Sequence, residues 1–182
     1  LLLKYEVVIR FAFFLGLLVL MAIWELLAPR RPLTISKASR WISNLGIVLM
    51  DSLAVRLILP VQAVGMALFV ETHGWGILNN VMLPPEMKII LGVLGLDLVI
   101  YLQHAMFHGL PLFWRLHRMH HTDLDFDVTT GIRFHPLEIL LSMGIKMAAV
   151  AVLGPSAVAV VLFEVLLNAT SMFNHGNVRL PK

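Results

Sequence analysis

Histidines are concentrated in the second half of this 182-residue chain, in patterns that suit metal binding. Seven of the eight lie within the segment 104–175, and five of these seven fall into two tight clusters. The clusters are an H-x-x-x-H pattern and, after an eight-residue spacer, an H-x-x-H-H pattern, formed by His104 and His108 and by His117, His120 and His121. Residues three or four apart share one face of a helix, and neutral imidazole is the commonest protein ligand for zinc, copper, iron and nickel. The two clusters therefore predict a polyhistidine site for two metal ions.

Other chemistries are excluded by residues that the chain lacks. It contains no cysteine, which excludes zinc fingers and redox dithiols. The H-E-x-x-H helix of metalloproteases is also absent. A lone histidine on an apolar face is usually a core residue, but two clusters this close together favour metal binding.

A carboxylate and a phenol continue the stripe that carries the first histidine pair. The stripe consists, at intervals of four, three and four residues, of Asp97, Tyr101, His104 and His108. A carboxylate inside a membrane span is costly and is treated as functional by default. We expect Asp97 and Tyr101 to belong to the catalytic site, with Asp97 orienting a ligating imidazole; the alternative for Asp97 is an interhelical hydrogen bond or an ion pair with Arg56.

The remaining histidines have different expected roles. His135 precedes a proline that suits the start of a helix, so it is either a further ligand or a helix cap. His175 precedes Gly176, a residue type that favours the end of a helix, and its expected position beside the clusters predicts a ligand. His73 is expected to be an ordinary surface histidine.

The composition is that of a membrane protein. The chain is 59% hydrophobic with a mean hydropathy of +0.86, and only 14% of its residues are charged, against about 25% in soluble proteins. The net charge of +3 needs no nucleic acid to explain it. Residues 7–27 show no features of a removable signal peptide. We expect one membrane domain, residues 1–182, with the histidine-rich region at 97–181.

Four apolar segments predict an all-α integral membrane bundle of about three spans plus a helical hairpin. A span needs about 20 mainly apolar residues. The segments are residues 7–27, 42–70, 87–107 and 137–173. Pro60 is expected to kink the second segment, and Gly154-Pro155 to divide the fourth into two short arms. Lys146 and Glu164 are expected to pair across this hairpin.

Loop charges predict the orientation of the bundle. Residues 29–40 hold four basic residues and no acidic one, whereas residues 71–86 hold no lysine or arginine. The positive-inside rule places the first loop in the cytoplasm and the second outside. The third span then delivers His104 and His108 to the cytoplasmic face, and the hairpin returns His175 to the same side. We therefore expect a multi-pass protein with a cytoplasmic metal site.

The order of these motifs resembles the fatty acid hydroxylase or sterol desaturase superfamily. The resemblance covers about residues 97–181, and residues 124–138 look closest to bacterial sterol-desaturase-like and alkylglycerol-monooxygenase-like members. The motifs that carry it are the two histidine patterns, the R-x-H-P-x-E pattern of residues 133–138 and the H-x-N pattern of residues 175–177. The resemblance implies a membrane di-iron oxygenase that hydroxylates or desaturates a lipid with dioxygen and electrons from a separate donor protein. The positions that match metal ligands are His104, His108, His117, His120, His121 and His175.

One departure from the family pattern leaves two further functions open. The family has a last H-x-x-H-H pattern some way after the position of His175, and no such pattern follows His175 in the 182 residues, so we expect the domain to be incomplete. The alternatives are a truncated homologue without activity and a metal-transport protein. We expect two iron ions, although zinc can occupy such nitrogen ligands in purified protein.

Overall fold

A computed structural model describes residues 5–180; the first four residues and the last two, including the end of the predicted region 97–181, lie outside the described residues. The described chain is all-helical, as predicted. Its seven α-helices are α1 (Glu6–Leu27), α2 (Lys37–Ile58), α3 (Ala63–Thr72), α4 (Pro85–Gly109), α5 (Pro111–His121), α6 (Pro136–Leu153) and α7 (Ala157–His175). Two short 3-10 helices, Ile77–Asn79 and Thr130–Ile132, lie in the connections.

Proline and glycine set most of the helix boundaries. Helices α4, α5 and α6 each begin with proline, which lacks the N–H that a first helical residue leaves unbonded. The predicted kink at Pro60 is a complete break: α2 ends at Ile58 because the residue before a proline is disfavoured in helical geometry. Gly154 ends α6 in the left-handed conformation, with φ of 64°.

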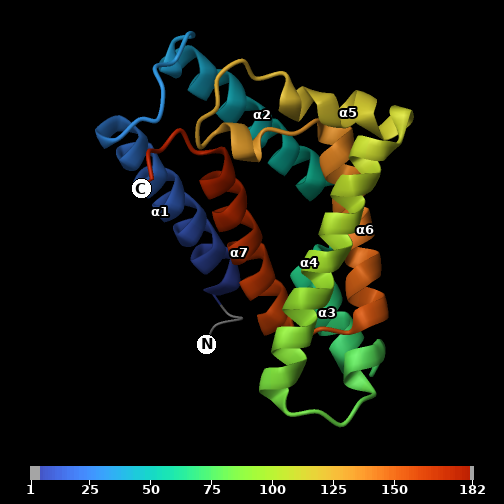
Figure 1. Ribbon diagram of the computed structural model, residues 1–182. Coiled ribbons are helices and arrows are strands. Elements are labelled where there is room, and N and C mark those ends of the chain that lie inside the picture. Colours follow the sequence, from blue (N-terminus) through green and yellow to red (C-terminus); the bar gives the residue numbers. More distant parts are fainter. Residues whose placement is uncertain (1–4, 181–182) are drawn as a thin grey trace.

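Helix α7 lies between α1 and α4 and packs on both, while α6 packs on α3 and α4 (Figure 1). The predicted hairpin is present as α6 and α7, and Lys146 pairs with Glu164 across it at 3.0 Å, as predicted. The prediction of short arms was wrong. The arms have 18 and 19 residues, and each is long enough to cross a membrane because the positive-φ glycine allows a tight reversal that uses few residues.

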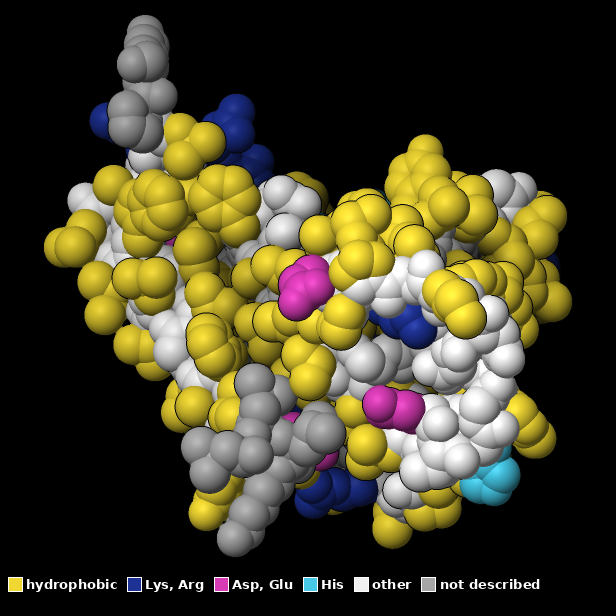
Figure 2. All heavy atoms as spheres, turned by 90° about the horizontal axis from the view of Figure 1, so that it is seen from below, with side chains coloured by type: hydrophobic (Ala, Val, Ile, Leu, Met, Phe, Trp, Pro, Cys, Tyr) yellow, Lys and Arg dark blue, Asp and Glu magenta, His cyan; other side chains and the backbone are white. Residues whose placement is uncertain are grey.

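The outer surface matches a protein that lies in lipid. Five helical segments are long and apolar enough to cross a membrane, with α2 and α3 counted together. Many large hydrophobic side chains point outward, and seen from the end opposite α5 the surface is mostly hydrophobic (Figure 2). The chain is therefore a multi-pass membrane protein in its architecture.

Three segments meet at one end of the bundle, beside α5 (Figure 1). They are residues 28–36 between α1 and α2, residues 122–135 between α5 and α6, and residues 176–180 after α7. The amide of Arg30 donates to the carbonyl of Asn177 at 3.1 Å, and the amide of Thr34 donates to Asp125 at 2.8 Å. The buried carboxylate of Glu25 accepts the amide hydrogens of Val128 in the second segment and Asn177 in the third. These are the segments that the loop charges assign to one side; which side of the membrane this is stays a prediction.

Candidate metal centre

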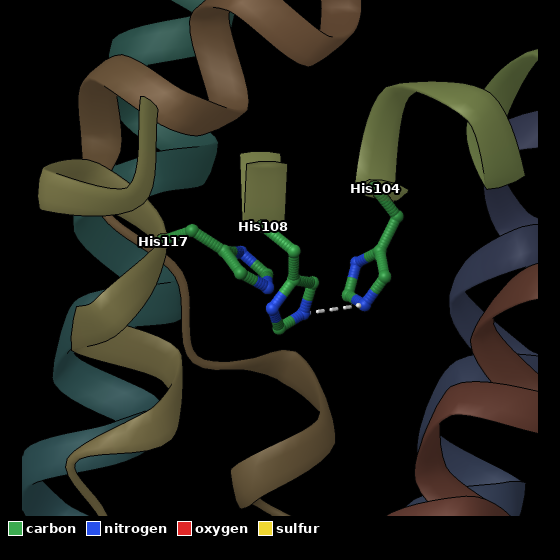
Figure 3. A group of neighbouring side chains, drawn as sticks. All are labelled: His104, His108 and His117. Atoms are coloured by element: carbon green, nitrogen blue, oxygen red, sulfur yellow. Dashed lines mark hydrogen bonds between the residues drawn. The ribbon is translucent and has the colours of Figure 1, made fainter. Parts of the chain in front are cut away.

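The two histidine clusters face each other because the chain turns sharply between α4 and α5. Gly109 ends α4, and Leu110 alone separates it from Pro111, the first residue of α5. This turn brings His117 of α5 over the last turns of α4, beside His104 and His108 (Figure 3). One ring nitrogen from each of the three histidines lies within 4.8 Å of the others, an arrangement that could hold a metal ion.

The same group extends along α5. The Nε2 atoms of His104 and His108 are 3.2 Å apart, and those of His117 and His121 are also 3.2 Å apart. The ring centroids of His108 and His121 lie 4.9 Å apart. These four histidines, His104, His108, His117 and His121, form what we call the first histidine group.

A second pair lies beside this group. His175, at the end of α7, approaches His120 with 2.9 Å between the two Nε2 atoms. The ring centroids of His120 and His117 are 5.4 Å apart. The structure thus brings together six of the seven histidines predicted as metal ligands, from three helices, in two adjoining groups.

The separations suit ligands that share a metal ion. Metal–nitrogen bonds of about 2.1 Å at angles of about 90–109° place two ligand nitrogens about 3.0–3.4 Å apart. The three Nε2–Nε2 separations of 3.2, 3.2 and 2.9 Å are close to this range.

The hydrogen-bond partners of the Nδ1 atoms identify which ring nitrogen of His120 and His175 carries the proton. Nδ1 of His120 faces the carbonyl oxygen of Arg133 at 3.1 Å, and Nδ1 of His175 faces the carbonyl oxygen of Ser171 at 2.7 Å. A carbonyl oxygen only accepts hydrogen bonds, so Nδ1 must be the donor in both rings. In neutral His120 and His175 the two Nε2 atoms are then both acceptors, and at 2.9 Å their facing lone pairs are satisfied by a shared cation, either a proton or a metal ion.

Burial keeps His120 and His121 neutral. Burial and the neighbouring His175 lower the pKa of His120 to about 3. Burial and His117 also lower the pKa of His121. Neutral imidazole is the form that binds metal, so these histidines are ready to ligate at neutral pH.

A carboxylate orients the central histidine. Oε1 of Glu138, in the first turn of α6, lies 2.7 Å from Nδ1 of His117, and both side chains are buried. The other oxygen, Oε2, is buried with no hydrogen-bond partner among the described residues. Such a carboxylate fixes the ring so that Nε2 points into the first histidine group. The sequence signal was the charged Glu138 three residues after His135, within the R-x-H-P-x-E pattern, but no role was predicted for it.

Three predicted site residues lie apart from the paired nitrogens. His135 caps α6, where its Nδ1 accepts the amide hydrogen of Leu137 at 3.2 Å. Asp97 and Tyr101 are exposed on α4 and make no hydrogen bond to a histidine within residues 5–180. Asp97 is seven residues from His104, about 10 Å along the helix axis. The expected hydrogen bond from Asp97 to an imidazole is therefore not formed; Glu138 occupies that role.

The site and fold define a membrane-embedded polyhistidine protein. A model of the fatty acid hydroxylase family matches residues 89–182, and the chain belongs to this family. Membership implies a membrane oxidoreductase of the hydroxylase or desaturase kind, which modifies lipids at a di-iron centre. Comparison with curated proteins and with solved structures gives no match.

Proposed function

We propose that this protein oxidises a membrane lipid with dioxygen at a di-iron centre held by His104, His108, His117, His120, His121 and His175. The observation that carries the proposal is the pair of acceptor nitrogens of His120 and His175, 2.9 Å apart beside the first histidine group. Two lone pairs that face each other at this distance repel, whereas a metal cation bound between them is ligated by both.

Iron with nitrogen ligands can bind dioxygen and supply an oxidant strong enough for an unactivated C–H bond. In hydroxylation, one oxygen atom enters the C–H bond, and two electrons and two protons reduce the other to water. In desaturation, the lipid loses two hydrogen atoms, and two further electrons and protons complete the reduction of dioxygen to two waters. Both reactions need two electrons per turnover, which a separate electron-donor protein supplies.

The protein's own groups position the ligands and control access. Glu138 fixes the ring of His117, and the carbonyls of Arg133 and Ser171 fix the rings of His120 and His175. The burial of His117 and His120 excludes water from this part of the centre. His104 and His108 are exposed on the stripe of α4 that also carries Asp97 and Tyr101. We propose that a lipid approaches along this stripe and that Asp97 and Tyr101 contact it. A sterol, a fatty acyl chain or an alkyl lipid would each suit an apolar approach.

The proposed orientation places the centre on the cytoplasmic side, where the electron donor would reach it. Arg30 is exposed at this end, as are Arg115 and Arg118 on α5. These are the basic residues expected of a cytoplasmic face. Ligands collected at one end also favour an oxygenase over metal transport, because a transport path needs ligands across the membrane depth.

The test is lipid oxidation by the purified protein under ¹⁸O₂, with a supplied reductant, and with iron measured by elemental analysis. Hydroxylation adds one ¹⁸O to the product, and desaturation removes two hydrogens without adding ¹⁸O. His120→Ala should lose metal and turnover, whereas the control His73→Ala, at an exposed position outside the centre, should keep both. Full iron content in folded His120→Ala would refute the ligand set, and wild-type protein with iron but no oxidised lipid would identify an inactive homologue.

A further inference from the structure

Arg40 is a buried charge whose side-chain hydrogen bonds, among the described residues, all go to one segment of the chain. It lies in the first turn of α2, with 5% of its surface exposed. Its guanidinium donates to both oxygens of Asp123, at 3.1 and 2.7 Å, and to Asp127 at 2.8 Å. It also donates to the carbonyl of Asp125 and to the hydroxyl of Thr130. The partners belong to residues 122–135, the connection between α5 and α6, which we call the 122–135 segment.

A second residue of α2 continues this attachment. Asn44, one turn after Arg40, donates to the hydroxyl of Thr129 at 2.8 Å and accepts from Nη1 of Arg133 at 3.3 Å. Asn44 and Thr129 are both fully buried. The 122–135 segment is therefore fastened along one side to α2 by buried polar groups.

The other side of the segment reaches His120 and His175. The carbonyl of Arg133 accepts from Nδ1 of His120 at 3.1 Å. The carbonyl of Gly131 accepts from the Ser171 hydroxyl at 2.6 Å, and the Ser171 carbonyl orients His175. Gly131 also lies so close that an added Cβ would be 2.6 Å from the Ser171 oxygen and 3.2 Å from Nδ1 of His175. A shift of the segment would therefore move or release both histidines of the pair.

The first histidine group is oriented by other elements. His117 is held by Glu138 of α6, and His104 and His108 are carried by α4, without a hydrogen bond to the 122–135 segment among the described residues. Arg40 is consequently placed to affect one half of the centre and not the other.

We propose that Arg40 is a positioning residue for the His120–His175 half of the metal centre, acting through the 122–135 segment. The inference rests on the proposed ligand set. Arginine suits this role because its planar fork binds two carboxylates at fixed angles and keeps its charge at any physiological pH. Lysine carries the same charge but not the fork, so Arg40→Lys should restore little of the geometry.

The experiment compares Arg40→Gln and Arg40→Lys with the control Arg30→Gln, which removes the same charge from an exposed position at the same end of the bundle. Cobalt(II) is titrated into metal-free protein in detergent. Its visible absorption reports the coordination of each ion, and elemental analysis gives the number bound. Helical circular dichroism and size-exclusion elution report folding.

Arg40→Gln should fold and weaken one of the two cobalt sites by about 10- to 100-fold, the usual effect of losing support for a ligand, while the other site keeps its affinity and spectrum. Arg40→Lys should weaken the same site, and Arg30→Gln neither. Two unchanged sites in folded Arg40→Gln, or equal weakening of both, would overturn the inference while the ligand set stands.

Folding outcomes also decide the question. If Arg40→Gln fails to fold, Arg40→Lys provides the measurement; if neither folds, Arg40 stabilises the whole bundle and is not a selective positioning residue. Absence of any cobalt binding by wild-type protein would refute the proposed ligand set, and the inference with it.

Discussion

Replacing Glu138 by glutamine separates the metal affinity of the centre from the stability of the fold. The carboxylate accepts from Nδ1 of His117 at 2.7 Å, and both groups are buried. Glutamine keeps the shape and one acceptor oxygen but removes the charge. The charge makes His117 a better electron donor to a metal, so its loss should weaken metal binding.

The expected size follows from the kind of hydrogen bond. A bond to a charged group contributes about 1.5–3 kcal/mol and a neutral one about 0.5–1.5 kcal/mol. The difference of about 1–1.5 kcal/mol corresponds to a loss of affinity of about 5- to 12-fold. Glu138→Leu leaves the imidazole N–H without an acceptor, so its loss should approach about 100-fold.

Folding should respond differently from metal binding. The second oxygen of Glu138 is buried without a hydrogen-bond partner within residues 5–180, and the carboxylate interacts with the buried Asp51. Glutamine removes this like-charge repulsion, which offsets the weaker hydrogen bond to His117 in the metal-free protein, so metal-free Glu138→Gln should melt no lower than wild type.

Competition with a chelator of known affinity measures the metal, and thermal melting in detergent measures the fold. The matched control is Glu164→Gln, a buried carboxylate that pairs with Lys146 at 3.0 Å and Arg10 at 2.9 Å, away from the histidines. The control should lose stability and keep metal affinity. Equal metal affinity in Glu138→Gln and wild type would refute the reasoning.

Two further substitutions test the predicted site residues that lie apart from the paired nitrogens, His135 and Asp97. His135→Ala should lower the unfolding free energy by about 1 kcal/mol through loss of the cap on α6 and leave the metal content unchanged, whereas His135→Asn should restore stability; loss of a metal ion from folded His135→Ala would instead make His135 a ligand. Asp97→Leu should keep its metal, because Asp97 makes no hydrogen bond to a described histidine, and should reduce lipid turnover more than Asp97→Asn does. A drop in metal content in either Asp97 variant would show that the carboxylate acts on the histidines, and full turnover in both would remove it from the site.

The all-helical fold followed from the sequence because its signals are local. Apolar runs of span length and the residues Pro60 and Gly154 mark the helices and their breaks, and hydropathy alone is sufficient for this. The division of residues 137–173 at Gly154-Pro155 was predicted, and it already gives arms of 17 and 18 residues, close to the 18 and 19 observed; only their description as short was wrong, because helices of this length can cross a membrane. A left-handed glycine takes almost no residues from either helix, so both arms reach full span length.

The convergence of the histidines was also predictable, because helical spacing fixes which residues share a face. The partners of those histidines were not, since they depend on contacts between distant segments. Glu138 meets His117 only because α6 returns beside α5, whereas Asp97 shares a helix stripe with His104 yet lies too far along the axis. Arg40 looked like a topology signal in the sequence, and only the folded chain reveals that its charge is bound by Asp123 and Asp127.

Under the proposed di-iron ligand set, the facing acceptor nitrogens of His120 and His175 make the amount of this protein in the cell depend on the iron supply. A ligand that binds only the folded state stabilises it by about 2.7 kcal/mol when present at 100 times its dissociation constant. A chain made without metal lacks this contribution and keeps two lone pairs in contact at the end of α7. Newly made chains in iron-starved cells should therefore unfold more often and be degraded by membrane proteases, so that the amount of protein itself follows the iron supply.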